Sequence, residues 1–370
     1  MTFKFKQARS KLKRLEKIVL STGGTGGHIF PALALAQEIK AKYPECEIVF
    51  MGGKYGPEGK IVQEKGFAFR GLPVRGIMGR GIKGIVQLTG LGLALVQSIY
   101  WLKKIKPQVV VGFGSYAGFA PVYAAHILRL KRAIHEQNSF PGLTNRLLAR
   151  KVNRVFLSFP DEFGIFPKDR TVLTGNPIRQ EIKKVSFKED FSSKNLLILG
   201  GSQGATVLNK VVVKYLKEFK KQKINIWHQT GPRDYEWVKK EYVNIYPEAK
   251  VEAFIDNMTE AYSFADLVFC RAGASTIAEL CAVKRPSILV PYPYAAYDHQ
   301  LKNAQALEKI GAALVVLQPY LQEINFASLV IDYLESPAKL RQMAENSLKL
   351  GENRASEKIL EEIEGLIQGD

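Results

Sequence analysis

The sequence predicts an α/β protein made of two doubly wound parallel-sheet domains that face a central cleft. Short apolar segments alternate with amphipathic helical segments, which is typical of parallel sheets covered by helices on both faces. The alternation pauses in a polar, charged stretch and restarts at "NLLILGGSQGA" (195–205). A chain of 370 residues also exceeds what one hydrophobic core usually holds. We therefore expect an N-terminal domain at 1–175, a linker at 176–194 and a C-terminal domain, with the final helices, at 195–370.

The expected strands are short apolar runs that end in glycine or polar residues. In the first domain they are "KIVLST" (17–22), "EIVFMG" (47–52), "VVVGFG" (109–114), "RAIHEQ" (132–137) and "RVFLSF" (154–159). In the second domain they lie in "NLLILGG", "INIWHQTG", "KVEAFI", "LVFCRAG", "PSILVPYP" and "AALVVLQ". Ligands of open parallel sheets bind outside the carboxyl ends of the strands, so the two domains are expected to frame one shared site.

The composition is that of a soluble globular protein, with 46% hydrophobic and 24% charged residues. The three cysteines, Cys46, Cys270 and Cys281, have neither disulfide nor metal-ligand spacing. No D-x-D sequence occurs, which argues against a metal-bridged nucleotide-sugar site, and we expect no metal and no cofactor. The start of the chain lacks the apolar core of a secretion signal. The uncharged segment 84–102 is expected to be a buried or surface-docked helix rather than a membrane span.

The excess positive charge is confined to the first half of the chain. The net charge is +18, and residues 1–170 hold 28 Lys or Arg and 10 Asp or Glu, whereas residues 171–370 hold 25 of each. A basic half favours an anionic partner: a nucleic acid, a phosphorylated substrate or an anionic membrane. The segment 69–92, "FRGLPVRGIMGRGIKGIVQLTGLG", mixes basic and apolar residues. This mixture fits a loop that enters a lipid headgroup region, or a mobile lid over the active site.

Two glycine-rich turns are expected between a strand and a helix at corresponding points of the two domains. They are "STGGTGGH" (21–28) and "GGSQGA" (200–205). Such turns expose backbone N–H groups at a helix N-terminus, which favours anions, and glycine lets the backbone approach a ligand closely. Neither is a Walker loop or a complete dinucleotide fingerprint. Each alone also fits a simple tight turn, but their repetition favours ligand binding.

Two further segments of the second domain carry polar groups at expected strand ends. "FCRAGASTIAEL" (269–280) offers a helix N-terminus with Arg271 beside it. Glu279, one turn into this helix, either binds a sugar diol or only favours the helix dipole. The segment "PYPYAAYDHQLKNAQAL" (291–307) follows, and its hydrogen-bonding groups suit a polyhydroxylated sugar: Asp298, His299, Gln300 and Asn303.

The first domain places four polar side chains of its own at expected strand ends. They are His28 in the first turn and His135, Glu136 and Asn138 in "IHEQNSF". Histidine and carboxylate side chains are the usual proton-transfer groups, so these residues are candidates for acid–base chemistry. Each alone is also compatible with a purely structural role.

Seven motifs occur together in one order: "TGGTGGH", "HEQN", "TGNPIR", "GGSQGA", the Phe254–Ile255 pair, "CRAGASTIAE" and "DHQLKNA". In this order they resemble the MurG family of bacterial peptidoglycan N-acetylglucosaminyltransferases, which belongs to glycosyltransferase family 28 and has the two-domain GT-B fold. The resemblance extends from Lys17 onward. It implies inverting transfer of N-acetylglucosamine (GlcNAc) from UDP-GlcNAc to the 4-hydroxyl of the N-acetylmuramoyl-peptide in lipid I, its undecaprenyl-diphosphate-linked form. The product is lipid II, and the implied location is the cytoplasmic face of the plasma membrane, as a peripheral protein.

The resemblance also implies which residues bind the substrates. In the second domain, Ile255 is expected to contact uracil through its backbone, Glu279 to bind the ribose hydroxyls and Gln300 to bind the GlcNAc hydroxyls. The diphosphate is expected at Ser202 with its turn and at the helix start formed by Ala274, Ser275 and Thr276. Asn138 and Arg179 match further donor-binding positions, and Thr25, Gly26 and Gly27 match a turn that borders donor and acceptor. The segment "YDHQ" lacks the doubled acidic residue that some relatives carry before the histidine.

Inverting transfer is a single displacement, in which a base helps to deprotonate the acceptor hydroxyl. His28 is the preferred base because the pKa of an imidazole lies near the operating pH, and Glu136 is its competitor. The charge of the departing UDP needs fixed dipoles and positive groups, which are expected to be helix N-termini and Arg271. The basic first domain is expected to face the anionic membrane and the diphosphate of the acceptor.

Three other functions stay open at this point. Another GT-B transferase would glycosylate a diacylglycerol or a lipid A precursor. A UDP-GlcNAc 2-epimerase of the same two-domain plan would turn over the donor without an acceptor. A basic nucleic-acid-binding protein is disfavoured because the sequence has no recognisable nucleic-acid module, so no nucleic acid is expected as a partner.

Overall fold

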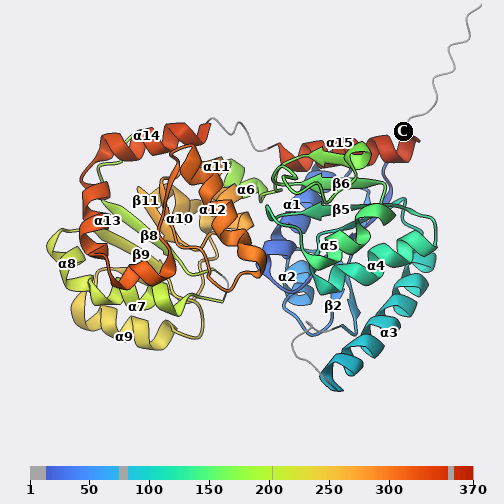
Figure 1. Ribbon diagram of the computed structural model, residues 1–370, viewed down its shortest axis with the longest axis horizontal. Coiled ribbons are helices and arrows are strands. Elements are labelled where there is room, and N and C mark those ends of the chain that lie inside the picture. The colour runs from blue at the N-terminus through green and yellow to red at the C-terminus, as the bar shows by residue number, and fades with distance from the viewer. Residues whose placement is uncertain (1–13, 75–81, 202, 349–353, 370) are drawn as a thin grey trace, which may run out of the picture.

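The computed structural model describes residues 14–74, 82–201, 203–348 and 354–369. It contains two α/β domains, the first on the right and the second on the left of Figure 1. The first domain has a seven-stranded sheet in the order β3-β2-β1-β4-β5-β6-β7. Its strands are β1 (Lys17–Ser21), β2 (Glu47–Gly53), β3 (Ala68–Leu72), β4 (Val109–Gly112), β5 (Lys131–Glu136), β6 (Arg154–Leu157) and β7 (Thr171–Leu173).

The second domain has a six-stranded sheet in the order β10-β9-β8-β11-β12-β13. Its strands are β8 (Asn195–Leu199), β9 (Asn225–Gln229), β10 (Lys250–Glu252), β11 (Leu267–Cys270), β12 (Ser287–Leu289) and β13 (Ala313–Val315). All neighbouring strands in both sheets are parallel. The strand order reverses next to β1 in one sheet and next to β8 in the other, which is the topological switch point of doubly wound folds. The predicted fold class is confirmed.

Helices cover both faces of each sheet. Those of the first domain are α1 (Gly26–Lys42), α2 (Glu58–Glu64), α3 (Ile82–Ile105), α4 (Ser115–Ile127) and α5 (Leu143–Leu148). Those that follow are α6 (Gln180–Lys183), α7 (Thr206–Lys214), α8 (Leu216–Lys221), α9 (Tyr235–Ile245), α10 (Met258–Phe264), α11 (Ala274–Val283), α12 (His299–Lys309), α13 (Phe326–Leu334), α14 (Pro337–Leu348) and α15 (Ala355–Gln368).

The strand sequences explain why both faces are covered. In β1, Ile18 and Leu20 pack into one buried apolar cluster while Val19 packs into the cluster on the other face. In β8, Leu196 and Leu197 divide between two clusters in the same way. Successive side chains of a strand point to opposite faces, so an uninterrupted apolar strand needs cover on both.

The last helix corrects the expected domain assignment. The final helices were all expected on the second domain, but α15 packs on the first, as Figure 1 shows. Ile359, Leu360 and Ile363 are buried in the same cluster as Ile18 and Leu20. The expected linker at 176–194 is also not a free connection, because its Ile178 and Ile182 are buried in the core of the second domain.

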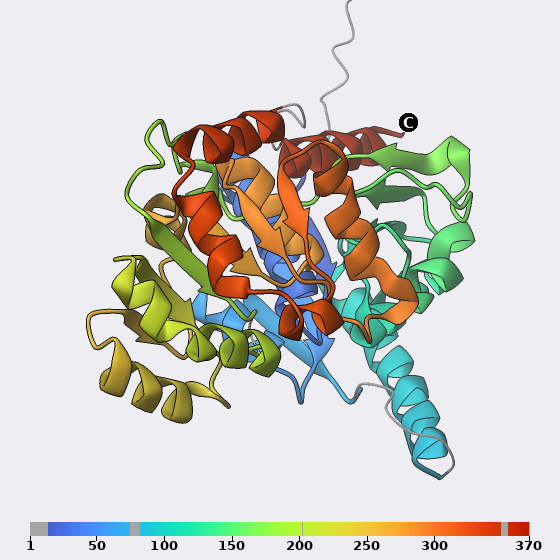
Figure 2. The ribbon, with the colours of Figure 1, turned by 60° about the vertical axis from the view of Figure 1, so that its left-hand side comes forward.

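The segment 69–92, expected to be a loop, is mostly regular structure. Its start belongs to β3, and from Ile82 onward it forms α3, while residues 75–81 lie outside the described part. Helix α3 includes the segment 84–102 and packs on α4, as expected of a surface-docked helix. It projects from the body of the first domain in Figures 1 and 2. Within the described ranges, no helix has the length and apolar character needed to cross a bilayer.

A candidate active site between the two sheets

The carboxyl ends of the two sheets face each other across a cleft. In the first domain, β1 and β4 lead into the starts of α1 and α4, and in the second, β8 and β11 lead into turns before α7 and α11. The hydroxyl of Ser275, at the start of α11, donates a hydrogen bond to the carbonyl oxygen of Gly27 over 3.3 Å. The helix start of one domain therefore contacts the glycine turn of the other.

The first turn needs its glycines for both space and conformation. A Cβ at Gly23 would lie 2.6 Å from a carboxylate oxygen of Glu58 and 2.8 Å from Cβ of Ala117. Gly24 has a φ of +86°, which side chains disfavour. The carbonyl oxygen of Thr25 accepts the N–H groups of His28 and Ile29, which starts α1. The turn thus brings Thr25, Gly26 and Gly27 to the edge of the cleft, where they are at least partly exposed.

His28 is part of a hydrogen-bonded chain that leads into the first domain. Its Nδ1 lies 3.0 Å from Oε1 of Gln137, whose Nε2 lies 3.1 Å from Nδ1 of His135. His135 is fully buried, and its Nε2 donates to the carbonyl oxygen of Gly175 over 3.0 Å. Burial lowers the pKa of His135 to about 4, although the Gly175 carbonyl partly opposes this shift. The ring of His135 is therefore neutral near neutral pH, whereas His28 is only partly buried.

Glu136 has a complete set of hydrogen bonds. Its Oε1 accepts the backbone and side-chain N–H groups of Asn138 at 3.0 and 3.2 Å. Its Oε2 accepts the backbone N–H of Gly142 at 3.0 Å and the side-chain amide of Asn145 at 2.8 Å. A carboxylate has about four lone-pair sites, so all are in use. This buried side chain holds the loop after β5 in place, which favours a structural role over that of a base.

The partly buried Arg179 and the buried Glu279 form an ion pair on the second domain's side of the cleft. Nη2 of Arg179 lies 3.0 Å from Oε1 of Glu279, and the hydroxyl of Tyr262 donates to Oε2 over 2.9 Å. Burial alone would lower the pKa of Arg179, but the charge and hydrogen bond of Glu279 outweigh it and raise that pKa. The guanidinium carbon also lies 5.0 Å from the ring centre of Phe30, which comes from α1. Arg179 therefore neutralises Glu279 at the domain boundary.

The other predicted donor residues lie on neighbouring elements of the second domain. Ala274, Ser275 and Thr276 form the first turn of α11, which leaves N–H groups without partners inside the helix. Ile255 is buried in the loop after β10. Oε1 of Gln300 accepts the backbone N–H of Tyr292 over 3.0 Å, which leaves its amide N–H groups to donate elsewhere. Ser202 lies outside the described residues.

Two residues singled out in the sequence have other partners in the structure. Arg271 donates to the carbonyl oxygens of Val290 and Pro291 at 3.3 Å and to Oε1 of Gln318 at 2.7 Å. Its guanidinium is thus committed within the second domain, so the expected role beside a diphosphate is not supported. The fully buried Asn303 accepts the backbone N–H of Ser139 over 3.1 Å, which joins the domains rather than presenting a sugar-binding group.

Sequence reasoning missed Gln137 and Tyr262. Gln137 stands inside "HEQN", beside residues that were singled out, but an amide attracts no attention as an acid or base. Tyr262 lies on α10, 17 positions before Glu279, and no local pattern connects the two. Among the described side chains, no cluster of His, Cys, Asp and Glu could hold a metal ion.

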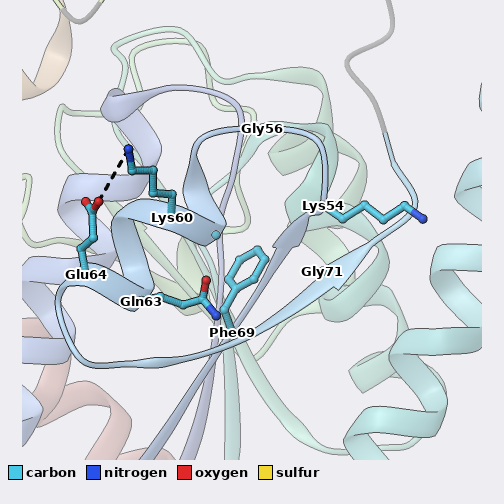
Figure 3. A pocket seen from close by; sticks show the side chains of 8 residues that line it. Lys54, Gly56, Lys60, Gln63, Glu64, Phe69 and Gly71 are labelled. Atoms are coloured by element: carbon cyan, nitrogen blue, oxygen red, sulfur yellow. Dashed lines mark ion pairs between the residues drawn. The ribbon is translucent and has the colours of Figure 1, made fainter.

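A cavity of about 640 Å³ lies in the first domain, beside α2 and β3. Lys54, Lys60, Gln63 and Phe69 are among the residues that line it (Figure 3). Lys60 makes an ion pair of 3.8 Å with Glu64, another lining residue. None of the predicted site residues lines this cavity, so it is separate from the candidate active site.

Comparison with known sequences identifies two matching domain families. A model of the glycosyltransferase family 28 N-terminal domain matches residues 18–157, and one of the family 28 C-terminal domain matches residues 195–359. A protein of Nitratidesulfovibrio vulgaris strain Hildenborough is 44% identical over 96% of this chain and 98% of its own. One of Lawsonia intracellularis is 45% identical with the same coverage. Both are named UDP-N-acetylglucosamine–N-acetylmuramyl-(pentapeptide) pyrophosphoryl-undecaprenol N-acetylglucosamine transferase.

Solved structures with the same fold include enzymes of more than one reaction class. The crystal structure of Acinetobacter baumannii MurG has a TM-score of 0.71 and 28% identity, and the match covers 95% of this chain and 99% of that one. A putative UDP-N-acetylglucosamine 2-epimerase from Listeria monocytogenes has a TM-score of 0.66 but only 11% identity, with 96% and 98% coverage. The second likeness concerns the fold alone.

Proposed function

This chain is a member of glycosyltransferase family 28, and from its near full-length likeness to named relatives we infer its reaction. It transfers GlcNAc from UDP-GlcNAc to N-acetylmuramyl-(pentapeptide) pyrophosphoryl-undecaprenol, lipid I, and so forms lipid II for peptidoglycan. The observation that carries the assignment to this cleft is the contact between Ser275 and Gly27. It brings the start of α11, the proposed site of the donor diphosphate, against the turn that borders the acceptor.

The proposed donor site uses the second domain. Glu279 binds the ribose through Oε2, which accepts only the Tyr262 hydroxyl and keeps capacity for a further donor, whereas Oε1 accepts both Nε and Nη2 of Arg179. Arg179 neutralises its charge, so that the carboxylate does not repel the diphosphate nearby. The N–H groups at Ala274, Ser275 and Thr276 hold the diphosphate. Ile255 contacts uracil, and the amide of Gln300 donates to GlcNAc hydroxyls. Ser202 and, from the first domain, Asn138 complete the set.

The proposed chemistry is one displacement with inversion at the sugar carbon. His28 accepts the proton of the acceptor 4-hydroxyl as that oxygen bonds to the anomeric carbon and UDP departs with the bonding electron pair. Glu136 is unsuited because its lone pairs are occupied. Because Arg271 is hydrogen-bonded elsewhere, the N-terminal, positive end of the α11 dipole stabilises the negative charge that develops on UDP.

We also propose that the first domain associates with the cytoplasmic face of the plasma membrane through α3 and the adjoining part of 69–92. Leu93, Val96 and Tyr100 recur on one side of α3 and are exposed. Lys103 and Lys104 follow in its last turn. Exposed apolar side chains with neighbouring cations suit an anionic headgroup region, which also holds the lipid substrate.

A transfer assay with UDP-GlcNAc and a lipid I analogue tests the reaction, with a diacylglycerol acceptor and a reaction without acceptor as controls. The expected result is GlcNAc transfer to the lipid I analogue alone. Transfer to diacylglycerol would instead support another lipid glycosyltransferase. Turnover of UDP-GlcNAc without acceptor would support the epimerase reaction, since a putative epimerase has the same fold.

A further inference from the structure

We propose that Gln137 is a positioning residue that holds His28 with its hydrogen on Nδ1. This leaves Nε2 as the ring nitrogen that receives the acceptor proton. The proposal rests on the function above, in which His28 is the base, and adds the group that prepares it. A neutral imidazole carries one hydrogen, and it accepts a proton only at the other nitrogen.

The surroundings of Gln137 fix which way its amide points. Nε2 lies 3.2 Å from the carbonyl oxygen of Phe113, and Oε1 lies 3.0 Å from Nδ1 of His28. A carbonyl oxygen only accepts, so turning the amide over would place two acceptors against each other at Phe113. With this orientation, Oε1 faces His28, and because Oε1 also only accepts, Nδ1 of His28 must carry the hydrogen.

His135 fixes Gln137 from the other side. Nε2 of His135 must be protonated because its partner at 3.0 Å is the carbonyl oxygen of Gly175. Nδ1 of the neutral ring is then bare and accepts from Nε2 of Gln137 at 3.1 Å. Both Gln137 and His135 are buried, so water does not compete for these bonds. The order of hydrogens is therefore set along the whole chain from Gly175 to His28.

Two other histidines, His228 and His126, carry their hydrogen on the opposite ring nitrogen, Nε2. His228 lies with Nε2 3.0 Å from Oδ1 of Asn209 and with Nδ1 3.0 Å from the hydroxyl of Tyr242. The amide of Asn209 donates to the carbonyl oxygen of Thr230, so its Oδ1 faces His228 and requires a hydrogen on Nε2. His126 accepts at Nδ1 from Arg132. His28 thus differs from these rings in its tautomer.

The consequence for the reaction is a defined proton path. The acceptor oxygen bonds to the anomeric carbon, the bond from that carbon to UDP breaks, and the electron pair leaves with UDP. The hydroxyl proton passes to Nε2 of His28, and the resulting imidazolium keeps its Nδ1–H on Oε1 of Gln137. Without Gln137, the hydrogen of the neutral ring is free to occupy Nε2 and block it.

Nitrogen NMR of protein labelled with ¹⁵N-histidine tests this directly, because the chain has 5 histidines. The signals of His28 are identified by their loss in His28→Ala. At a pH where the ring is neutral, we expect His28 to be protonated on Nδ1, and His135 and His228 on Nε2. A His28 protonated on Nε2 in the unmodified protein overturns the proposal, whatever the variants do.

Variants of Gln137 add a catalytic readout. Gln137→Met has a similar shape without hydrogen bonds, so we expect His28 to gain protonation on Nε2 and kcat to fall by at least about 10-fold. KM for UDP-GlcNAc should change less than about two-fold, because Gln137 is outside the proposed donor site. Gln137→Glu keeps an accepting oxygen and should restore the Nδ1–H form with part of the rate. An unchanged kcat in a folded Gln137→Met variant also overturns the proposal.

A matched control is Gln108→Met. Gln108 makes three hydrogen bonds to the backbone of Arg14, Glu16 and Lys17, at the amino ends of the strands. The Gln108→Met variant should lose stability while its His28 tautomer and its kcat stay unchanged. The two proposals can fail separately. Normal transfer by His28→Ala contradicts the role of His28 as base, whereas protonation of the unmodified His28 on Nε2 contradicts the role of Gln137 alone.

Discussion

The two domains have the same strand order around their switch points but different contents at the strand ends. In the second domain, charged groups pair with one another: Arg179 neutralises Glu279 beside the start of α11, the proposed site of the donor diphosphate. In the first domain, a buried chain of neutral groups leads to the partly exposed His28. The comparison teaches that one scaffold holds a paired charge at the strand ends of one copy and a chain of neutral, hydrogen-bonded groups in the other.

A second contrast concerns charge and surface. The excess positive charge lies entirely in residues 1–170, and in this half α3 exposes an apolar stripe. The second domain balances its charges and pairs many of them, as with Lys188 and Asp266. This difference fits a first domain that faces an anionic membrane and a second domain that binds a soluble nucleotide.

The largest expected effect comes from removing the imidazole that distinguishes the first domain. His28→Ala should lower kcat by roughly 10²- to 10⁴-fold, the range that general base catalysis contributes. KM for UDP-GlcNAc should stay nearly constant, because all the proposed donor residues except Asn138 lie outside the first domain. Steady-state kinetics with a lipid I analogue measures both constants. Near-normal turnover of His28→Ala at saturating substrate would contradict the proposal that the first domain supplies the general base.

The next effect tests whether the buried histidine of the second domain is only structural. Burial lowers the pKa of His228 to about 3, so the unfolded chain binds a proton that the folded chain does not. The contribution of His228 to the free energy of unfolding is therefore fully present above about pH 6.5 and is lost as the pH falls toward 3. His228→Gln should reduce the acid-induced loss of unfolding free energy by up to about 5 kcal/mol, an upper limit.

Chemical denaturation between about pH 7 and 4 measures this difference. GlcNAc transfer at neutral pH should change little in the His228→Gln variant, apart from any loss of folded protein. An identical pH dependence of stability in the two proteins would contradict the buried, neutral state of His228.

A smaller effect is expected for nucleotide binding. Glu279→Gln removes the charge that pairs with Arg179 and weakens acceptance of the ribose hydroxyls. Affinity for UDP should fall by roughly 10- to 100-fold, since hydrogen bonds to charged groups contribute about 1.5–3 kcal/mol. Calorimetric titration with UDP measures it. Tyr262→Phe is the matched variant: it removes one donor but keeps the ion pair, so its loss should be smaller. An equal or larger loss would show that charge pairing is not what matters there.

The smallest effect compares two exposed valines on helices of different domains. Val96 on α3 and Val243 on α9 are 63% and 60% exposed. Val96→Ser should weaken binding to anionic vesicles by about three- to ten-fold, from the loss of roughly 1 kcal/mol of apolar contact. Val243→Ser should not. Vesicle sedimentation at low and high salt measures both, and equal binding to neutral and anionic vesicles would contradict the proposed membrane surface.

The sequence by itself determined the architecture and the position of the cleft. Apolar strands without polar alternation require helices on both faces of the sheet, so the apolar runs at 17–22 and 195–199 predicted two parallel sheets. The glycine turns after them marked the strand ends, which is where ligands of open parallel sheets usually bind. These features are local in the chain, and periodicity and turn chemistry suffice to predict them.

Tertiary structure alone decided which polar groups are available for chemistry. The sequence could not show that Glu136 is fully hydrogen-bonded, that Arg271 is committed to Gln318, or that Gln137 connects His28 to His135. It also could not assign α15 to the first domain. The same physical reason applies to all four. An amphipathic pattern predicts that a helix packs against a partner, and the chemistry of a side chain determines which hydrogen bonds it can form. Only the folded chain determines which distant group satisfies them.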